Sequence, residues 1–154
     1  VDNGKDKTAR EAMSQAQYIA GMGFSNVGLG IVHSMAHPLG AFYDTPHGVA
    51  NALLLPYVME YNADSPAASK YINIAKAMGV NTEGMTEAEG VKAAVNAVKK
   101  LSLSIHIPQK LSEIGVKEED IPSLEVDAFN DVCTGGNPRP TSVADIETLY
   151  HKAF

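Results

Sequence analysis

The chain has 154 residues, of which 45% are hydrophobic, and its 12 Lys and Arg against 18 Asp and Glu give a formal net charge of −6. This length suits one domain with a sizeable buried core. The negative charge, with basic residues scattered along the chain, argues against a nucleic-acid or anionic-membrane partner. Apolar runs such as residues 52–56 are far shorter than the roughly 20 residues that span a bilayer.

The ends and the cysteine content indicate where such a chain would reside. The single Cys excludes an internal disulfide and suits a reducing cytoplasm. The polar start contains no signal peptide and no initiator Met, so we expect a fragment or processed piece of a longer protein.

The hydrophobic pattern has a helical period along most of the chain and shows no convincing alternation of period two. No Gly-rich strand-to-helix turn is present, so the chain has no nucleotide-binding unit of its own. The fold class that we predict is all-α, a helical bundle forming one domain over residues 1–154. The expected helices cover residues 8–22, 27–37, 46–61, 65–78, 86–101, 108–114, 122–132 and 142–154.

The first two of these helices carry specific expectations. A turn at residues 21–26 should close the first helix, and Pro38 should end the second. Gly28 and Gly30 each cost a helix roughly 1 kcal/mol, which suggests close approach of another backbone or a ligand. The side chains expected on the inner face of the first helix are Ala12, Ala16, Tyr18, Ile19 and Met22.

Later helices have recognisable starts. Ser65 followed by a proline, Thr86 with Glu89, and Ser142 with an Asp three residues on are all N-terminal capping patterns. The helix over residues 46–61 is apolar nearly all round and should be central. The only long loop with dense turn chemistry covers residues 131–140, and it is either a plain connector or part of a site.

Three histidines in a short stretch carry the main chemical signal. His33 and His37 are four residues apart, so a helix places both imidazoles on one face. His47 lies between a Pro and a Gly, at a chain reversal that can return it to that face. Imidazole is a common ligand for divalent metals, and the spacing makes His33 and His37 the natural chelating pair.

Two alternatives stand beside this metal-site hypothesis. A buried histidine is often only a hydrogen-bonded core residue. A closed structural zinc site is excluded, because it needs four ligands, typically several of them Cys. Any metal here is therefore either catalytic with open positions or completed by residues from elsewhere.

The stretch over residues 28–51, Gly-Leu-Gly-Ile-Val-His-Ser-Met-Ala-His-Pro-Leu-Gly-Ala-Phe-Tyr-Asp-Thr-Pro-His-Gly-Val-Ala-Asn, resembles a signature of the iron-containing alcohol dehydrogenases. The loop Asp-Val-Cys-Thr-Gly-Gly-Asn-Pro-Arg at residues 131–139 is similar to a late loop of the same family. The resemblance extends over essentially the whole chain. It implies the all-helical C-terminal domain of a two-domain enzyme whose N-terminal α/β domain binds the nucleotide.

The resemblance also implies roles for the histidines. The family's metal is held by one Asp and three His in the cleft between the domains. Two of those histidines match His33 and His47, while the Asp and the other His belong upstream of this chain. His37 then lies beside the nicotinamide and substrate, as a catalytic and cofactor-contacting residue. This conflicts with the chelating pair that the spacing favours.

Further implications concern the pocket, cofactors and partners. Phe24 and Cys133 would line the substrate pocket, with ordinary core packing as the alternative for each. The implied cofactors are Fe²⁺, with Zn²⁺ as the alternative, and NAD, with NADP as the alternative, bound mainly by the N-terminal domain. The implied partners are a small aldehyde or alcohol, that N-terminal domain, and further copies in a homo-oligomer.

Competing functions remain open at this point. The first is a metal-dependent, NAD(P)-linked reductase of a small aldehyde such as lactaldehyde, with 1,3-propanediol or another primary alcohol as alternative substrate. By itself the chain should have no activity, because it has half a metal site and no nucleotide-binding unit. The alternative from another class is a non-catalytic helical domain that binds a metal or a partner.

Overall fold

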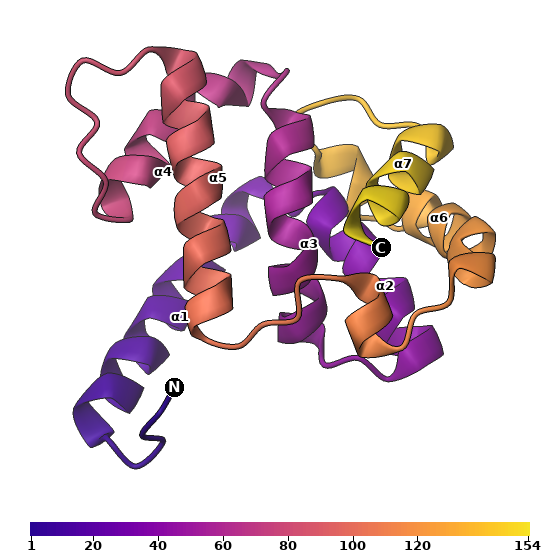
Figure 1. Cartoon of the computed structure of the whole chain (residues 1–154), viewed down its shortest axis with the longest axis horizontal. Helices are drawn as coiled ribbons and strands as arrows, with labels where there is room; N and C mark the ends of the chain where they lie inside the picture. Colours follow the sequence, from indigo (N-terminus) through magenta and orange to yellow (C-terminus); the bar gives the residue numbers. More distant parts are fainter.

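The computed structural model describes residues 1–154 as helices and connecting turns, with no β-strand (Figure 1). This confirms the predicted all-α fold. None of the helices is both long and apolar enough to cross a membrane. The α-helices are α1 (Lys7–Val27), α2 (Ile31–Tyr43), α3 (His47–Asn62), α4 (Tyr71–Ala77), α5 (Glu87–Ser104), α6 (Ile121–Asn130) and α7 (Val143–Ala153), and the short 3₁₀ helices cover Pro66–Lys70, Leu111–Ile114, Glu118–Asp120 and Thr134–Gly136.

The larger hydrophobic core lies among α2, α3, α6 and α7. The Tyr150 side chain of α7 is fully buried, and its hydroxyl donates to the Met35 carbonyl oxygen of α2 at 2.7 Å. A second, smaller core lies among α3, α4 and α5, where the buried Tyr71 hydroxyl donates to the Met59 carbonyl oxygen. Helix α3 contributes to both cores, as its nearly all-round apolar sequence predicts.

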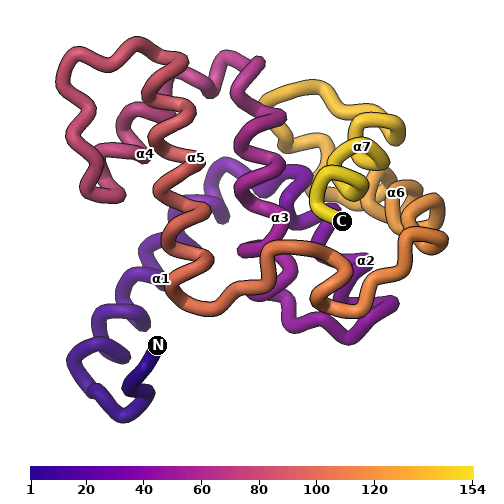
Figure 2. Tube along the Cα trace, viewed as in Figure 1, coloured from indigo at the N-terminus to yellow at the C-terminus, as the bar shows by residue number.

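Helix α1 differs from the prediction in length and in packing. It continues through the expected turn at residues 21–26 and ends at Gly28, whose φ of 81° is favourable for glycine and whose N–H donates to the Phe24 carbonyl oxygen. None of its residues is buried, and Ile19 on the expected inner face is 67% exposed. The expected packing of that face is wrong for this chain, because α1 points away from the body (Figure 2) and no other element covers it.

Helix α2 begins later and ends later than predicted. It starts at Ile31 and continues through Pro38 to Tyr43, where Asp44 adopts the left-handed conformation. A proline inside a helix costs about 3 kcal/mol. Met35 and Leu39, one on each side of Pro38 in the sequence, are fully buried in the larger core. This burial offsets the cost, so the helix does not stop at the proline.

The close approach predicted at Gly28 and Gly30 is confirmed at Gly30 and wrong at Gly28. A Cβ atom on Gly30 would lie 3.1 Å from the Asn137 side-chain oxygen, and one on Gly136 would lie 2.1 Å from the Leu29 carbonyl oxygen. The 131–141 loop therefore packs directly on the segment that leads into α2. Gly28 has open space around it, and its positive φ alone favours glycine there.

The other predicted boundaries agree to within a few residues. Ser65, Thr86 and Ser142 cap helices as expected, and the last two form complete capping boxes. The predicted helix over residues 65–78 is divided into a 3₁₀ turn and α4, and the one over 108–114 contracts to the 3₁₀ helix Leu111–Ile114.

Candidate metal and substrate site

The three histidines lie together, as predicted from their spacing. His33 and His37 lie one turn apart on α2, and the short link at residues 44–46 returns the chain so that His47 opens α3. The ring centroids are 5.4 Å apart for His33 and His47, 5.4 Å for His37 and His47, and 6.2 Å for His33 and His37. The chain reversal thus forms a cluster of imidazoles.

The environment of His33 favours the neutral ring that a metal requires. His33 is partly buried, whereas His37 and His47 are exposed. Burial, reinforced by the neighbouring His47 and His37, lowers the pKa of His33 below its usual value. A neutral imidazole is the form that binds a divalent metal.

The donor set fits part of a metal site. With metal–nitrogen distances of about 2.1 Å, two imidazoles on one ion have centroids roughly 5 Å apart, close to the separation of His33 and His47. Asn51 lies one turn after His47, and its side-chain oxygen is buried without a hydrogen-bond partner. A buried oxygen without a partner carries a free-energy penalty that a bound group can relieve. Two imidazoles still leave most of a coordination shell to be supplied by other groups.

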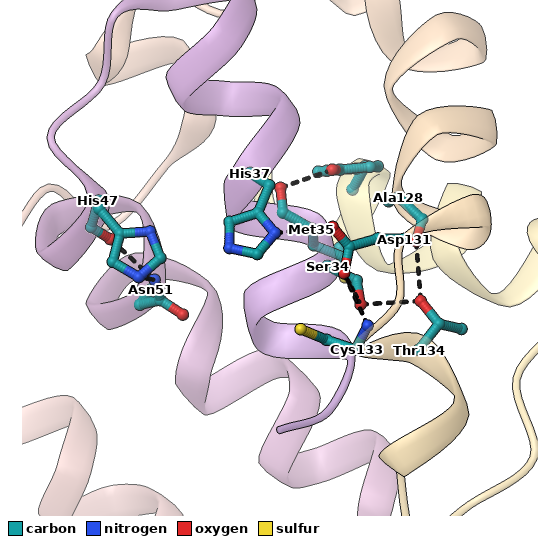
Figure 3. A network of polar contacts seen from close by, with 10 residues as sticks. Ser34, Met35, His37, His47, Asn51, Ala128, Asp131, Cys133 and Thr134 are labelled. Carbon is teal, nitrogen blue, oxygen red and sulfur yellow. Dashed lines mark hydrogen bonds and ion pairs between the residues drawn. The ribbon is translucent and has the colours of Figure 1, made fainter. Parts of the chain in front are cut away.

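His37 is held from the other side by a carboxylate. Its Nδ1 atom lies 2.7 Å from Oδ2 of Asp131, which follows α6 and is 94 residues away in sequence (Figure 3). Cys133 lies beside this pair: the ligand atoms of His37, Asp131 and Cys133 are all within 4.8 Å of one another, and no other His, Cys, Asp or Glu group of three is so close. The three histidine rings alone do not converge as tightly.

The Asp131 carboxylate is ionised in this setting. Burial by itself would raise its pKa, but the hydrogen bonds that it accepts from Cys133 and His37 outweigh burial, and the net pKa lies below the usual value. The Cys133 backbone N–H donates to Asp131 Oδ1 at 2.8 Å. An ionised carboxylate only accepts hydrogen bonds, so His37 donates through Nδ1–H.

Cys133 is close to His37, as a pocket residue would be. Burial raises the pKa of its thiol, and the adjacent Asp131 carboxylate raises it further. The thiol is therefore protonated at neutral pH, which makes it a poor nucleophile. The predicted role in the substrate pocket stays a prediction.

The role of Phe24 in the substrate pocket stays a prediction. Phe24 lies on α1 and is 45% exposed, so the alternative of core packing does not describe it either. A cavity of about 790 Å³ lies next to His33, and Val27, Gly30, Asn51 and Asn137 are among the residues that line it. This volume is in the range of small-molecule pockets. Phe24 is not among its lining residues.

The 131–141 loop is tied firmly to α3. The side-chain amides of Asn62 and Asn137 donate to each other at 3.0 and 2.8 Å. The Arg139 guanidinium lies 4.0 Å from the centre of the Tyr61 ring and donates to the Tyr61 carbonyl oxygen and to Asp64. These contacts bind the loop to α3, and Asp131 and Cys133 of the same loop lie beside His37.

Sequence reasoning assigned no role to Asp131 or to Asn51. Asp131 stood in the quoted loop motif, but nothing local indicated its pairing with a histidine 94 residues earlier. Asn51 stood one turn after His47, a spacing that places both on one helix face and could have drawn attention to it.

The whole chain, residues 1–154, matches the family model for the C-terminal region of the Fe-containing alcohol dehydrogenase family. The chain belongs to the Fe-containing alcohol dehydrogenase family. It is 60% identical over 149 residues to lactaldehyde reductase of Escherichia coli (strain K12), covering 97% of this chain and 39% of that protein. It is 44% identical to 1,3-propanediol dehydrogenase of Citrobacter freundii over 98% of this chain and 39% of that protein.

Solved structures agree with the family. The chain superposes on 1,3-propanediol oxidoreductase with a TM-score of 0.94 at 43% identity, covering 98% of this chain and 39% of that one. It superposes on an alcohol dehydrogenase from Oenococcus oeni with a TM-score of 0.92 at 40% identity, covering 99% of this chain and 39% of that one. The chain therefore spans about two fifths of the length of these iron-containing alcohol dehydrogenase relatives.

Proposed function

We propose that this chain is the metal-binding and substrate-binding C-terminal domain of an NAD(P)-linked alcohol dehydrogenase that interconverts lactaldehyde and 1,2-propanediol. The observation that carries the proposal is the imidazole cluster: the ring centroids of His33 and His47 are 5.4 Å apart, a separation that suits two ligands of one ion. The centroids of His37 and His47 are equally far apart, so the choice of His33 rather than His37 rests on the family resemblance. The 60% identity to lactaldehyde reductase of Escherichia coli supports the substrate. The proposal includes a cytoplasmic, homo-oligomeric enzyme.

In this proposal His33 and His47 bind Fe²⁺, with Zn²⁺ as the alternative, and an Asp and a His from outside this chain complete the shell. When bound there, the ion would supply Lewis acidity, and the nicotinamide cofactor would supply the hydride chemistry. Relatives named NAD-dependent methanol dehydrogenase and NADPH-dependent butanol dehydrogenase support either nucleotide as the partner of this domain.

His37 has a different role from its two neighbours. Its Nδ1–H is engaged by Asp131, and the other ring nitrogen, Nε2, is available on an exposed side chain. In the proposal this nitrogen exchanges a proton with the substrate oxygen or orients it. Cys133, protonated and close to the His37 ring, contacts the substrate as an uncharged side chain.

The test is an assay of the complete protein that carries this chain. We expect reduction of lactaldehyde with NADH or NADPH, and oxidation of 1,2-propanediol with a higher kcat/KM than 1,3-propanediol. The 154-residue chain, assayed in parallel, should give no turnover above the blank. A preference for 1,3-propanediol would show that the proposed substrate, 1,2-propanediol, is wrong. Turnover of no alcohol or aldehyde would overturn the proposal in favour of a non-catalytic domain.

A further inference from the structure

Asp131 is the one carboxylate that contacts the histidine cluster, and the proposed function leaves it without a task. We propose that Asp131 is a positioning residue: by accepting the Nδ1–H bond of His37 it fixes the tautomer and the orientation of that ring. The Nε2 atom then keeps its lone pair and lies on the side away from Asp131, toward His47 (Figure 3). This inference rests on the proposed function for the role of His37 in turnover.

The hydrogen bonds around Asp131 leave only one arrangement of protons. Thr134 Oγ1 lies 2.8 Å from the Ala128 carbonyl oxygen, which can only accept, so Thr134 donates there. Thr134 must then accept from Ser34, whose Oγ is 2.8 Å away. Ser34 is left with no proton for Asp131 Oδ1, which lies at the longer distance of 3.5 Å. Asp131 therefore receives its hydrogen bonds from Cys133 and His37.

The carboxylate is held in place before any ligand arrives. Its Oδ1 is fixed by the Cys133 N–H, and its backbone opens a loop that the Asn62–Asn137 amide pair and the Arg139 contacts bind to α3. The Asp131 side chain is 18% exposed, against 40% for His37. A partly buried, anchored acceptor facing a half-exposed ring is the arrangement in which the acceptor orients the ring.

Asp131 and His37 do not have the geometry of two metal ligands. Two ligands of one tetrahedral ion, each about 2.1 Å from it, lie about 3.4 Å apart. The His37 Nδ1 and Asp131 Oδ2 atoms are 2.7 Å apart, a hydrogen-bond distance. The pair is therefore hydrogen-bonded.

The experiment compares Asp131→Asn with wild type in the complete protein. The substitution keeps the shape of the side chain, but the new amide can donate, so His37 is free to adopt the opposite tautomer. We expect a fall in kcat of about 10- to 100-fold, the size typical of a lost partner that orients a histidine, with metal content unchanged. The matched control is Asp64→Asn, which removes a carboxylate contact of the same loop at Arg139 without touching His37.

A second readout does not depend on turnover. In the metal-free complete protein, NMR of ¹⁵N-labelled histidine, assigned with a His37→Gln variant, should report a proton on Nδ1 of His37 in wild type and in Asp64→Asn. In Asp131→Asn the signal should move toward the Nε2–H tautomer. An unchanged tautomer in Asp131→Asn would overturn the inference. Because this readout does not depend on turnover, it tests the inference separately from the assay that tests the proposed function.

A double-variant cycle separates positioning from a general structural effect. If Asp131 acts through His37, Asp131→Asn should cause no further loss of kcat in a His37→Ala background. The same 10- to 100-fold loss in that background would show that Asp131 acts independently of His37. A shift of the tautomer without any change in kcat would likewise overturn the role in turnover.

Discussion

Helices α1 and α2 follow each other in the chain, and both carry apolar side chains at helical spacing, but α2 is packed into the core and α1 is exposed. Helix α2 buries six of its 13 residues against α3 and α6, whereas α1 buries none of its 21. Helix α2 also carries two of the clustered histidines. The apolar face of α1, including Tyr18, Ile19 and Met22, is left uncovered.

The contrast between α1 and α2 marks the limit of what hydrophobic periodicity indicates. An apolar stripe predicts that a helix has a buried face, but it does not say which element provides the cover. For α2 the cover lies within these 154 residues. For α1 it does not, which agrees with a chain that spans 39% of the length of its relatives.

The largest effect should come from the histidines of α2 and α3. In the complete protein, His33→Ala or His47→Ala should remove the metal and abolish activity together. His37→Ala should keep the metal and lower the rate by about 10²- to 10⁴-fold, the range for a lost acid–base or orienting group. Elemental analysis and turnover of the purified variants provide both measurements.

His151→Ala is the matched control, since this histidine lies on α7 beside Glu118, away from the cluster. A metal-free His37→Ala protein would show that the pair four residues apart on α2 is the true chelate. The spacing argument would then be correct and the ligand assignment from the family resemblance wrong.

The next effect concerns the packed face of α2. Leu39→Ala in the 154-residue chain should lower the free energy of unfolding by about 2–5 kcal/mol, because Leu39 is fully buried in the larger core. The wild-type chain should give a helix-rich far-UV circular dichroism spectrum and a cooperative melt, from which the loss is measured. A change below about 1 kcal/mol would contradict the description of α2 as part of the core.

Much of the fold was accessible from the sequence because its signals are local. The cap at Thr86 with Glu89, the cap at Ser142, and Gly115 with its φ of 83° all define helix ends through neighbours within a few residues. The errors arose where distant contacts prevail over local preference. Helix α2 passes through Pro38 because Met35 and Leu39 are buried by other elements, which no local pattern reveals.

The candidate site divides in the same way. The cluster of His33, His37 and His47 follows from helical spacing and one chain reversal, so it could be predicted. The partner of His37 could not, because Asp131 reaches it only through the packing of α6 beside α2. The ligand roles of His33 and His47 stay predictions that the metal analysis above decides.

A smaller effect should come from the anchor between the 131–141 loop and α3. Asn137→Ala removes the reciprocal amide pair and leaves Asn62 without that partner, so we expect a loss of about 1–3 kcal/mol in unfolding free energy. Urea melts of the 154-residue chain measure it. The exposed Asn26→Ala, on α1, is the matched control and should change little. Equal effects of the two substitutions would contradict the anchoring role.

The smallest effect should come from α1. Ile19→Ala in the 154-residue chain should change the unfolding free energy by less than about 0.5 kcal/mol, because the side chain is 67% exposed and Ala has the higher helix propensity. Met13→Ala, at the same exposure on the same helix, should behave alike. We expect the remaining part of the complete protein to cover this face, so Ile19→Ala should become clearly destabilising there. Urea midpoints of both variants, measured in the 154-residue chain and in the complete protein, test the contrast with Leu39.

A loss above about 1 kcal/mol of unfolding free energy in the 154-residue chain would mean that α1 packs on the body there. An unchanged, small effect in the complete protein would mean that the apolar face of α1 stays exposed there too.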